Sequence, residues 1–274
     1  MTQSRRQFIR VVPAFGVFSV SAFAQGPTAE PVWPDPPPAA GKPVDDSFPS
    51  HHPAVVKEMV AVSHGNVARV RELLQQHPEL AKASWDWGYG DWETALGAAS
   101  HVGNRPIAEL LLENGAPPTL FSATMLGQLE VVKMFITASP GLQRMRGPHG
   151  LTLMLHARQG GPQAAAVVKF LETLGDADQP YRNEPLSAEE RASIEGRYTF
   201  GDRPRDSFIV ATERNQLAMT RVGATQRNIY HQGQFAFHAA GAPSVKIRFE
   251  RDGAKVVALT VSDPDLVVRA RRQG

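Results

Sequence analysis

The chain contains no cysteine among its 274 residues. This absence excludes disulfides, thiol nucleophiles, iron–sulfur clusters and metal sites built on thiolates. The sequence also lacks any run of 18 or more apolar residues, so a membrane-spanning helix is not expected. With 42% hydrophobic residues the chain is long enough for a buried core, and its length favours two domains.

An excess of charge of either sign is missing as well. The chain has 29 basic and 27 acidic residues, for a formal net charge of +2. Arg5, Arg6 and Arg10 lie in a segment that we interpret as a removed leader, and without them 26 basic residues stand against 27 acidic ones. A nearly neutral chain has no general attraction to nucleic acid or to anionic lipid, so neither partner is predicted.

Residues 1–24 have the pattern of a signal peptide. An arginine-rich start is followed by an apolar segment, and Ala22 and Ala24 occupy the small-residue positions before a cleavage site. The start resembles the twin-arginine export consensus, which implies a bacterial protein that reaches the periplasm already folded. An uncleaved N-terminal anchor is the alternative. The residues that carry the resemblance are Ser4, Arg5, Arg6, Phe8, Ile9 and Arg10.

Residues 25–52 are rich in proline and are interpreted as an extended linker. His51 and His52 lie beside two aspartates in this segment. Adjacent histidines on a loop more often belong to a polar linker than to a metal site, so no metal is predicted there.

A helical pattern recurs between residues 53 and 178. In the fullest copy, 94–116, Thr94 opens a short helix, Gly103 makes a turn and Gly115 ends a second helix. This copy resembles an ankyrin repeat, and weaker copies flank it. Their second helices, aligned at Arg69, Ile107, Val131 and Val167, are spaced 38, 24 and 36 residues apart. The resemblance implies an ankyrin-repeat α-solenoid of about four repeats with one continuous core; a generic α-α solenoid is the alternative.

The segment between the first two copies holds three of the four tryptophans. Aromatic side chains are favoured in binding hot spots, so a protein partner is predicted to bind here. The alternative is that some of these rings cover the end of the first repeat or pack under the linker. The predicted partner-binding residues are Trp85, Asp86, Trp87, Tyr89, Asp91 and Trp92.

Four histidines in the helical region invite comparison with a metal site: His64, His101, His149 and His156. The first two follow Ser63 and Ser100 at equivalent repeat positions, and no carboxylate recurs with them. They are therefore interpreted as structural, and neither a metal nor a cofactor is predicted.

Beyond residue 187 the apolar pattern changes to alternation, with about seven short strands separated by turns such as Asp252-Gly253. This pattern predicts an antiparallel meander that closes into a small barrel. The segments 194–198 and 247–253 resemble the small β domain of some exported serine β-lactamase-like hydrolases. The hydrolase motifs Ser-x-x-Lys and Gly-x-Ser-x-Gly are absent, so no catalytic residue is predicted.

Together these patterns predict an α+β multidomain chain, with a signal peptide at 1–24, a linker at 25–52, an ankyrin-repeat α-solenoid at 53–178 and a small antiparallel β-barrel or meander at 187–274. The predicted function is that of an exported adaptor, not an enzyme, which binds a protein partner in the periplasm. The alternative is an envelope module that binds a glycan or a lipid-like molecule through the β domain or the Trp-rich finger. An unrecognised hydrolase is the third and least favoured possibility.

Overall fold

The computed structural model describes residues 46–264 and 266–274. The predicted signal peptide, with its export and cleavage residues, and most of the predicted linker lie outside the described residues. Within the described part, no helix combines the length and the apolar character that crossing a membrane requires.

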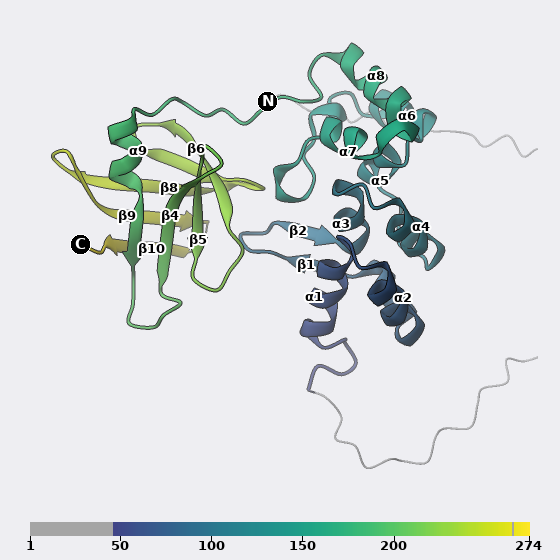
Figure 1. Ribbon diagram of the computed structural model, residues 1–274, viewed down its shortest axis with the longest axis horizontal. Helices are drawn as coiled ribbons and strands as arrows, with labels where there is room; N and C mark the ends of the chain where they lie inside the picture. The colour runs from purple at the N-terminus through teal and green to yellow at the C-terminus, as the bar shows by residue number, and fades with distance from the viewer. Residues whose placement is uncertain (1–45, 265) are drawn as a thin grey trace, which may run out of the picture. The chain divides into compact units, whose positions relative to one another are not determined.

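The first half of the described chain consists of short helices (Figure 1). Neighbours in sequence pack in pairs: α1 against α2, α3 against α4, α5 against α6 and α7 against α8. The helices are α1 (Pro53–Val62), α2 (Val67–Gln76), α3 (Ala95–His101), α4 (Arg105–Glu113), α5 (Leu120–Met125), α6 (Leu129–Ala138), α7 (Leu153–Gln159) and α8 (Ala165–Leu174), with 3-10 helices η1 (Pro78–Lys82), η2 (Leu142–Arg144), η3 (Pro148–Gly150) and η4 (Gly161–Ala164).

Polar side chains fix where several of these helices begin. Thr94, Thr119 and Thr152 are extended residues whose hydroxyl oxygens accept a hydrogen bond from the backbone N–H three residues further on. Asn66 and Asn104 do the same before α2 and α4. Each cap satisfies an N–H group that has no partner within its helix, and such caps contribute about 1 kcal/mol each.

One antiparallel hairpin projects from the helical region between η1 and α3 (Figure 1). Its strands are β1 (Ser84–Asp86) and β2 (Trp92–Thr94), with Ser84 opposite Thr94. The turn contains Gly88 and Gly90, both with positive φ. We refer to residues 84–94 as the finger.

The expected fold class, an ankyrin-repeat α-solenoid followed by a small β domain, is wrong. The described residues form nine short helices, α1 to α9, and a closed eight-stranded β-barrel. The helical region has one two-stranded hairpin and one isolated antiparallel bridge, between Arg146 and Thr152. Its buried apolar residues form two clusters, around Leu96 and around Leu153, instead of one continuous core. The prediction failed because capped helices with an apolar face occur in many helical arrangements, while the observed spacings departed from a regular repeat.

The second half of the described chain is the barrel. Helix α9 (Ala188–Ile194) leads into it, and Ser187 and Glu190 form a capping box at its start. All neighbouring strands are antiparallel, and β3 pairs with β10, which closes the barrel. The strands are β3 (Gly196–Thr199), β4 (Ser207–Glu213), β5 (Gln216–Arg221), β6 (Arg227–Gly233), β7 (Ala236–Ala239), β8 (Ala242–Asp252), β9 (Lys255–Asp263) and β10 (Leu266–Arg272).

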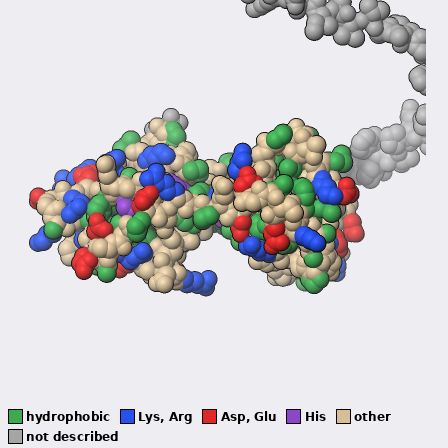
Figure 2. Space-filling view, turned by 90° about the horizontal axis from the view of Figure 1, so that it is seen from above, with side chains coloured by type: hydrophobic (Ala, Val, Ile, Leu, Met, Phe, Trp, Pro, Cys, Tyr) green, Lys and Arg blue, Asp and Glu red, His purple; other side chains and the backbone are tan. Residues whose placement is uncertain are grey.

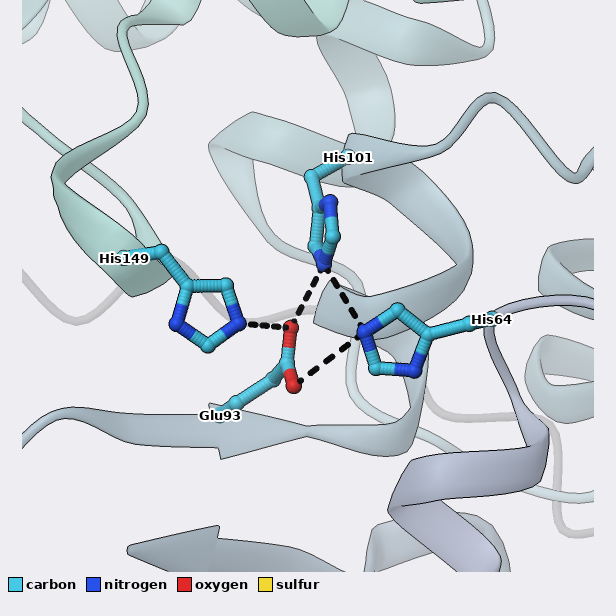
Figure 3. A group of neighbouring side chains, drawn as sticks. All are labelled: His64, Glu93, His101 and His149. Atoms are coloured by element: carbon cyan, nitrogen blue, oxygen red, sulfur yellow. Dashed lines mark hydrogen bonds and ion pairs between the residues drawn. The ribbon is translucent and has the colours of Figure 1, made fainter. Parts of the chain in front are cut away.

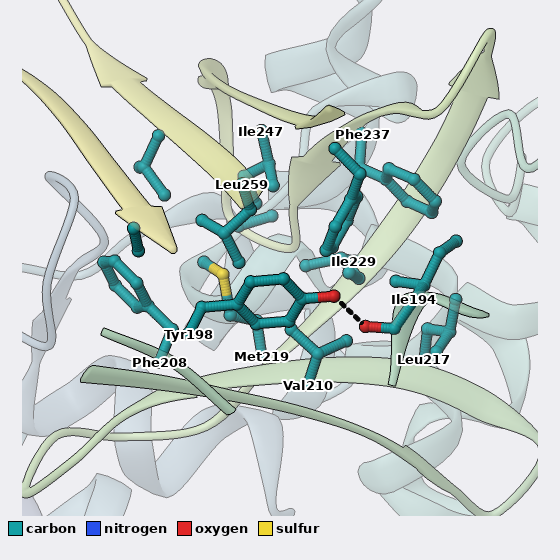
Figure 4. Close-up of a cluster of buried hydrophobic side chains, with 14 of the residues drawn as sticks. Ile194, Tyr198, Phe208, Val210, Leu217, Met219, Ile229, Phe237, Ile247 and Leu259 are labelled. Atoms are coloured by element: carbon teal, nitrogen blue, oxygen red, sulfur yellow. Dashed lines mark hydrogen bonds between the residues drawn. The ribbon is translucent and has the colours of Figure 1, made fainter. Parts of the chain in front are cut away.

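Side chains fill the interior of the barrel (Figure 4). The alternation is clearest in β8, where Val245, Ile247 and Phe249 are buried while Lys246 and Arg248 between them are exposed. Tyr198 is fully buried among them, and its hydroxyl donates a hydrogen bond to the carbonyl oxygen of Ile194. This packing makes the barrel interior a core.

Candidate metal centre

Four side chains from four separate segments meet at one point of the helical region (Figure 3). His64 lies in the turn after α1, Glu93 is the middle residue of β2, His101 is the last residue of α3, and His149 lies in η3. Each offers one ligand atom, and these atoms all lie within 4.8 Å of one another. We call this group the His3Glu cluster.

All three histidines present their Nε2 atoms to the centre of the cluster. The Nε2 atoms of His64 and His101 are 3.1 Å apart. Glu93 Oε1 lies 2.8 Å from His101 Nε2 and 3.3 Å from His149 Nε2, and Glu93 Oε2 lies 3.6 Å from His64 Nε2. Donor atoms around a tetrahedral zinc ion, with bonds of 2.0–2.1 Å, are separated by about 3.3–3.4 Å. The observed separations fall on both sides of that value.

Glu93 is fully buried, which is rare for a carboxylate unless it is paired or binds a metal. Its Oε2 atom accepts a hydrogen bond of 2.7 Å from the indole Nε1 of Trp87. Its Oε1 atom is buried and makes no regular hydrogen bond, although the Nε2 atoms of His101 and His149 lie 2.8 and 3.3 Å away. A buried carboxylate oxygen that lies beside three imidazole nitrogens is well placed to bind a metal ion.

The opposite ring nitrogens of two histidines are held by the protein. His64 Nδ1 lies 3.0 Å from the carbonyl oxygen of Ala61, and His149 Nδ1 lies 2.7 Å from Oδ2 of Asp91. In each pair the ring nitrogen donates a proton to the oxygen, which leaves Nε2 as the nitrogen that binds a metal. Metal-binding histidines in proteins are commonly oriented in this way.

The charges of the cluster follow from these contacts. Burial alone would raise the pKa of Glu93, but its contacts with His101 and His149 outweigh burial and hold that pKa at about 2. Burial alone would lower the pKa of His149, but the carboxylates of Asp91 and Glu93 raise it to about 9. The metal-free cluster therefore holds an imidazolium at His149, and a metal ion would displace the proton from its Nε2.

Burial would also raise the pKa of Asp91, but hydrogen bonds from His149, followed by the charge of Arg227, lower it. Asp91 therefore stays ionised beside the cluster. Its Oδ1 atom accepts a 2.8 Å hydrogen bond from the backbone N–H of His149.

The backbone of His149 is also unusual. Its φ of 59° lies in the left-handed region, which non-glycine residues seldom adopt. The two hydrogen bonds to Asp91 hold it there. Strained backbone that is kept in place by surrounding contacts is found most often at functional sites.

The predicted partner-binding residues do not share one exposed surface. Trp92 is 62% exposed, whereas Asp91 is buried and Trp85, Asp86 and Trp87 are half-buried. Tyr89 packs against the core of the barrel. On the face seen in Figure 2, basic and acidic side chains are interspersed without a large patch of one sign.

All three histidines of the cluster were predicted to be structural, and Glu93 was not among the predicted site residues. A signal was present, since His64 and His101 recur 37 residues apart after equivalent serines. Glu93 comes from the finger and His149 from the turn closed by the Arg146–Thr152 bridge, and both lie outside the helices on which the repeat pattern was aligned. His156 lies outside the cluster, buried on α7, and its Nδ1 is bonded to the carbonyl oxygen of Thr152.

A second group of possible ligands, His51, His77 and Glu79, lies on the surface. Glu79 Oε1 is 2.8 Å from His51 Nε2 and 3.7 Å from His77 Nδ1, and the Glu79 side chain is 58% exposed. Exposed groups of this kind are screened by water and bind metal weakly, so they serve as a natural comparison for the buried cluster.

No family model matches the chain, and no curated protein matches it. Among solved structures, a crystal structure of SurE is similar to 42% of this chain at 21% sequence identity, with a TM-score of 0.26. The similar region spans only 27% of that chain. A likeness of this size carries no argument about fold or function.

Proposed function

We propose that this protein binds one divalent transition-metal ion, with Zn²⁺ as its occupant, through the His3Glu cluster. The observation that carries the proposal is the convergence of three imidazole Nε2 atoms on one fully buried carboxylate, that of Glu93. Imidazole and carboxylate ligands suit Zn²⁺ and its neighbours in the first transition row, whereas Mg²⁺ and Ca²⁺ prefer oxygen ligands alone.

Four protein ligands fill a tetrahedral zinc site. Structural zinc sites are closed in this way, while catalytic ones usually have three protein ligands and keep a position for water or substrate. The proposed ion therefore joins segments that lie far apart in sequence: the turn after α1, the finger, the end of α3, and η3. This role agrees with the absence of a hydrolase motif in the sequence.

We also propose that the protein is exported. The twin-arginine resemblance supports a chain that crosses to the bacterial periplasm in its folded state. A protein that folds before export can acquire its metal in the cytoplasm, and a closed four-ligand site would retain the ion during passage.

Metal analysis of the full-length chain, purified without an affinity tag, tests the proposal. We expect one equivalent of Zn²⁺ per chain after loading and desalting. Glu93→Gln and His101→Ala should each lose most of it, because each removes one ligand. His77→Ala changes a histidine of the exposed group and should retain the metal. Wild-type protein that binds no zinc in solution would exclude this function.

We also propose Trp92 as a contact for a protein partner, because it is the predicted partner-binding residue that is mostly exposed. A photo-crosslinking residue at position 92 in exported protein should give one defined protein adduct. The same residue at position 266 is the control, since Leu266 on the barrel is also 62% exposed. Identical adducts from both positions, or none from position 92, would contradict this second proposal.

A further inference from the structure

Asp91 connects the His3Glu cluster with the barrel. On the cluster side its two carboxylate oxygens accept hydrogen bonds from the backbone N–H and from Nδ1 of His149, at 2.8 and 2.7 Å. On the barrel side its Oδ2 atom accepts a hydrogen bond from Nη1 of Arg227, the first residue of β6. The carboxylate is buried between these two partners.

The backbone of the barrel allows this close approach. A Cβ atom added to Gly241, in the turn between β7 and β8, would lie 2.9 Å from the carboxyl carbon of Asp91. A side chain at position 241 would therefore collide with the carboxylate, and glycine leaves the space that Asp91 occupies. Arg227 holds this carboxylate, because its side chain is only 5% exposed and therefore cannot swing freely into solvent.

Arg227 also lies close to the metal-binding ring itself. Its Nη1 atom is 3.3 Å from Nδ1 of His149. Both groups are donors, so this contact is not a favourable hydrogen bond when Nδ1 carries its proton. The shared partner Asp91 is what brings the guanidinium and the imidazole together.

We propose that Asp91 and Arg227 are positioning residues of the metal site: Arg227 fixes the Asp91 carboxylate, and Asp91 fixes the ring of His149 with Nε2 directed at the metal. The inference rests on the proposed zinc function. Its consequence is that the barrel takes part in metal binding, although the structure places no barrel residue among the four ligands.

Removal of the Arg227 charge distinguishes a positioning role of this residue from a purely electrostatic effect on the metal. Arg227 is a cation near the site of another cation, so removal of its charge alone would strengthen metal binding. Loss of the hydrogen bond from Arg227 to Asp91 would weaken metal binding, because Asp91 would no longer fix the ring of His149. The sign of the change therefore shows which of the two effects dominates.

Zinc affinity of the full-length chain, measured by competition with a chelator, is the test. Asp91→Asn should weaken Zn²⁺ binding by about 10- to 100-fold, the usual effect of losing the partner of a metal-binding histidine. Arg227→Gln should weaken it in the same direction by a smaller factor. Arg269→Gln breaks an ion pair with Glu250 on the barrel and should leave the affinity unchanged.

Asp91→Asn leaves a buried guanidinium without its carboxylate and therefore threatens folding. The double variant Asp91→Asn/Arg227→Gln removes both charges. If Arg227 acts through Asp91, the double variant should bind Zn²⁺ as weakly as Asp91→Asn does. The visible absorption of bound Co²⁺ should change in the variants but not in Arg269→Gln, because it reports on ligand geometry and not on stability.

The outcomes distinguish the two proposals. Wild-type protein without zinc affinity would overturn the proposed function, and this inference with it. Wild-type binding together with equal or tighter binding by a folded Arg227→Gln protein would overturn the inference alone. Independent, additive effects of the two substitutions would likewise show that Arg227 does not act through Asp91.

Discussion

The Nδ1 atom of His149 lies 2.7 Å from Oδ2 of Asp91, across 58 residues of sequence. The contact joins the finger to η3 and sets the orientation of a proposed metal ligand. The same aspartate pairs with Arg227 on the barrel. One carboxylate thus links two regions whose sequence patterns are entirely different.

Removal of metal should lower thermal stability. A ligand at 100 times its dissociation constant adds about 2.7 kcal/mol to the free energy of unfolding. For a chain of this size that corresponds to a rise in Tm of about 5–10 °C. Thermal unfolding of the full-length protein with Zn²⁺ and with excess chelator measures the difference. Glu93→Gln should show no such rise, and an equal rise in that variant would place the ion elsewhere.

Trp87→Phe, a substitution in the finger, should lower both the stability of the protein and its affinity for zinc. The substitution removes the indole N–H that bonds Glu93 Oε2, and a hydrogen bond to a charged group is worth about 1.5–3 kcal/mol. Urea unfolding and zinc titration should both show the loss. Trp85→Phe is the matched control, because the Trp85 side chain makes no hydrogen bond among the described residues. Equal effects of the two substitutions would argue that ring packing, and not this hydrogen bond, matters.

Because of the buried His156, the free energy of unfolding should fall as the solution becomes mildly acidic. Burial lowers its pKa from 6.5 to about 4, so between these values the unfolded chain binds a proton that the folded chain excludes. Its contribution to stability is complete above pH 6.5 and declines as the pH falls toward 4. The loss between pH 8 and pH 5 is about 2 kcal/mol.

Chemical unfolding of wild type and His156→Asn at both pH values tests this expectation. Asparagine keeps a donor for the Thr152 carbonyl oxygen but does not titrate, so its loss of stability should be smaller by about 2 kcal/mol. His77→Ala, which alters an exposed histidine, should behave as the wild type does. An unchanged pH dependence in His156→Asn would assign the acid sensitivity to other groups.

Gly103 and Gly175 should differ in their tolerance of a side chain, although both have φ near +75°. A Cβ atom at Gly103 would lie 2.2 Å from the backbone oxygen of Gln159, whereas nothing lies within 4 Å of one at Gly175. Gly175→Ala should cost about 1–2 kcal/mol from backbone strain alone. Gly103→Ala should cost about 1–3 kcal/mol more, because two turns must move apart. Equal free energies of unfolding would contradict the close approach seen here.

The sequence predicted local structure well where a few neighbouring residues decide it. Thr94 caps a helix as expected, and Gly103 makes the expected turn with positive φ. In the barrel, the expected turn at Asp252-Gly253 joins β8 to β9, with positive φ at Gly253. Side-chain caps and turn conformations depend on contacts over about four residues, so a single sequence carries them.

Residue patterns did not predict the arrangement of these elements. The ankyrin interpretation combined correct helix caps with an incorrect overall architecture, because an apolar helix face shows only that the helix packs and not against what. The same limit applied to the finger. Three tryptophans on a glycine-rich loop suggested an exposed surface. In the structure, Tyr89 packs against the barrel core, and the indole N–H of Trp87 donates a hydrogen bond to Glu93.

By itself, the sequence determined which residue types this protein has for chemistry: no thiol, few recognisable catalytic patterns, and histidines spread over the helical region. It also determined where helices and strands begin, because propensity and capping act over short distances. Only the tertiary structure decided that His64, Glu93, His101 and His149 converge and that Asp91 supports them from the side of the barrel. The physical reason is that the contacts among these buried side chains arise only when distant segments of the chain pack together.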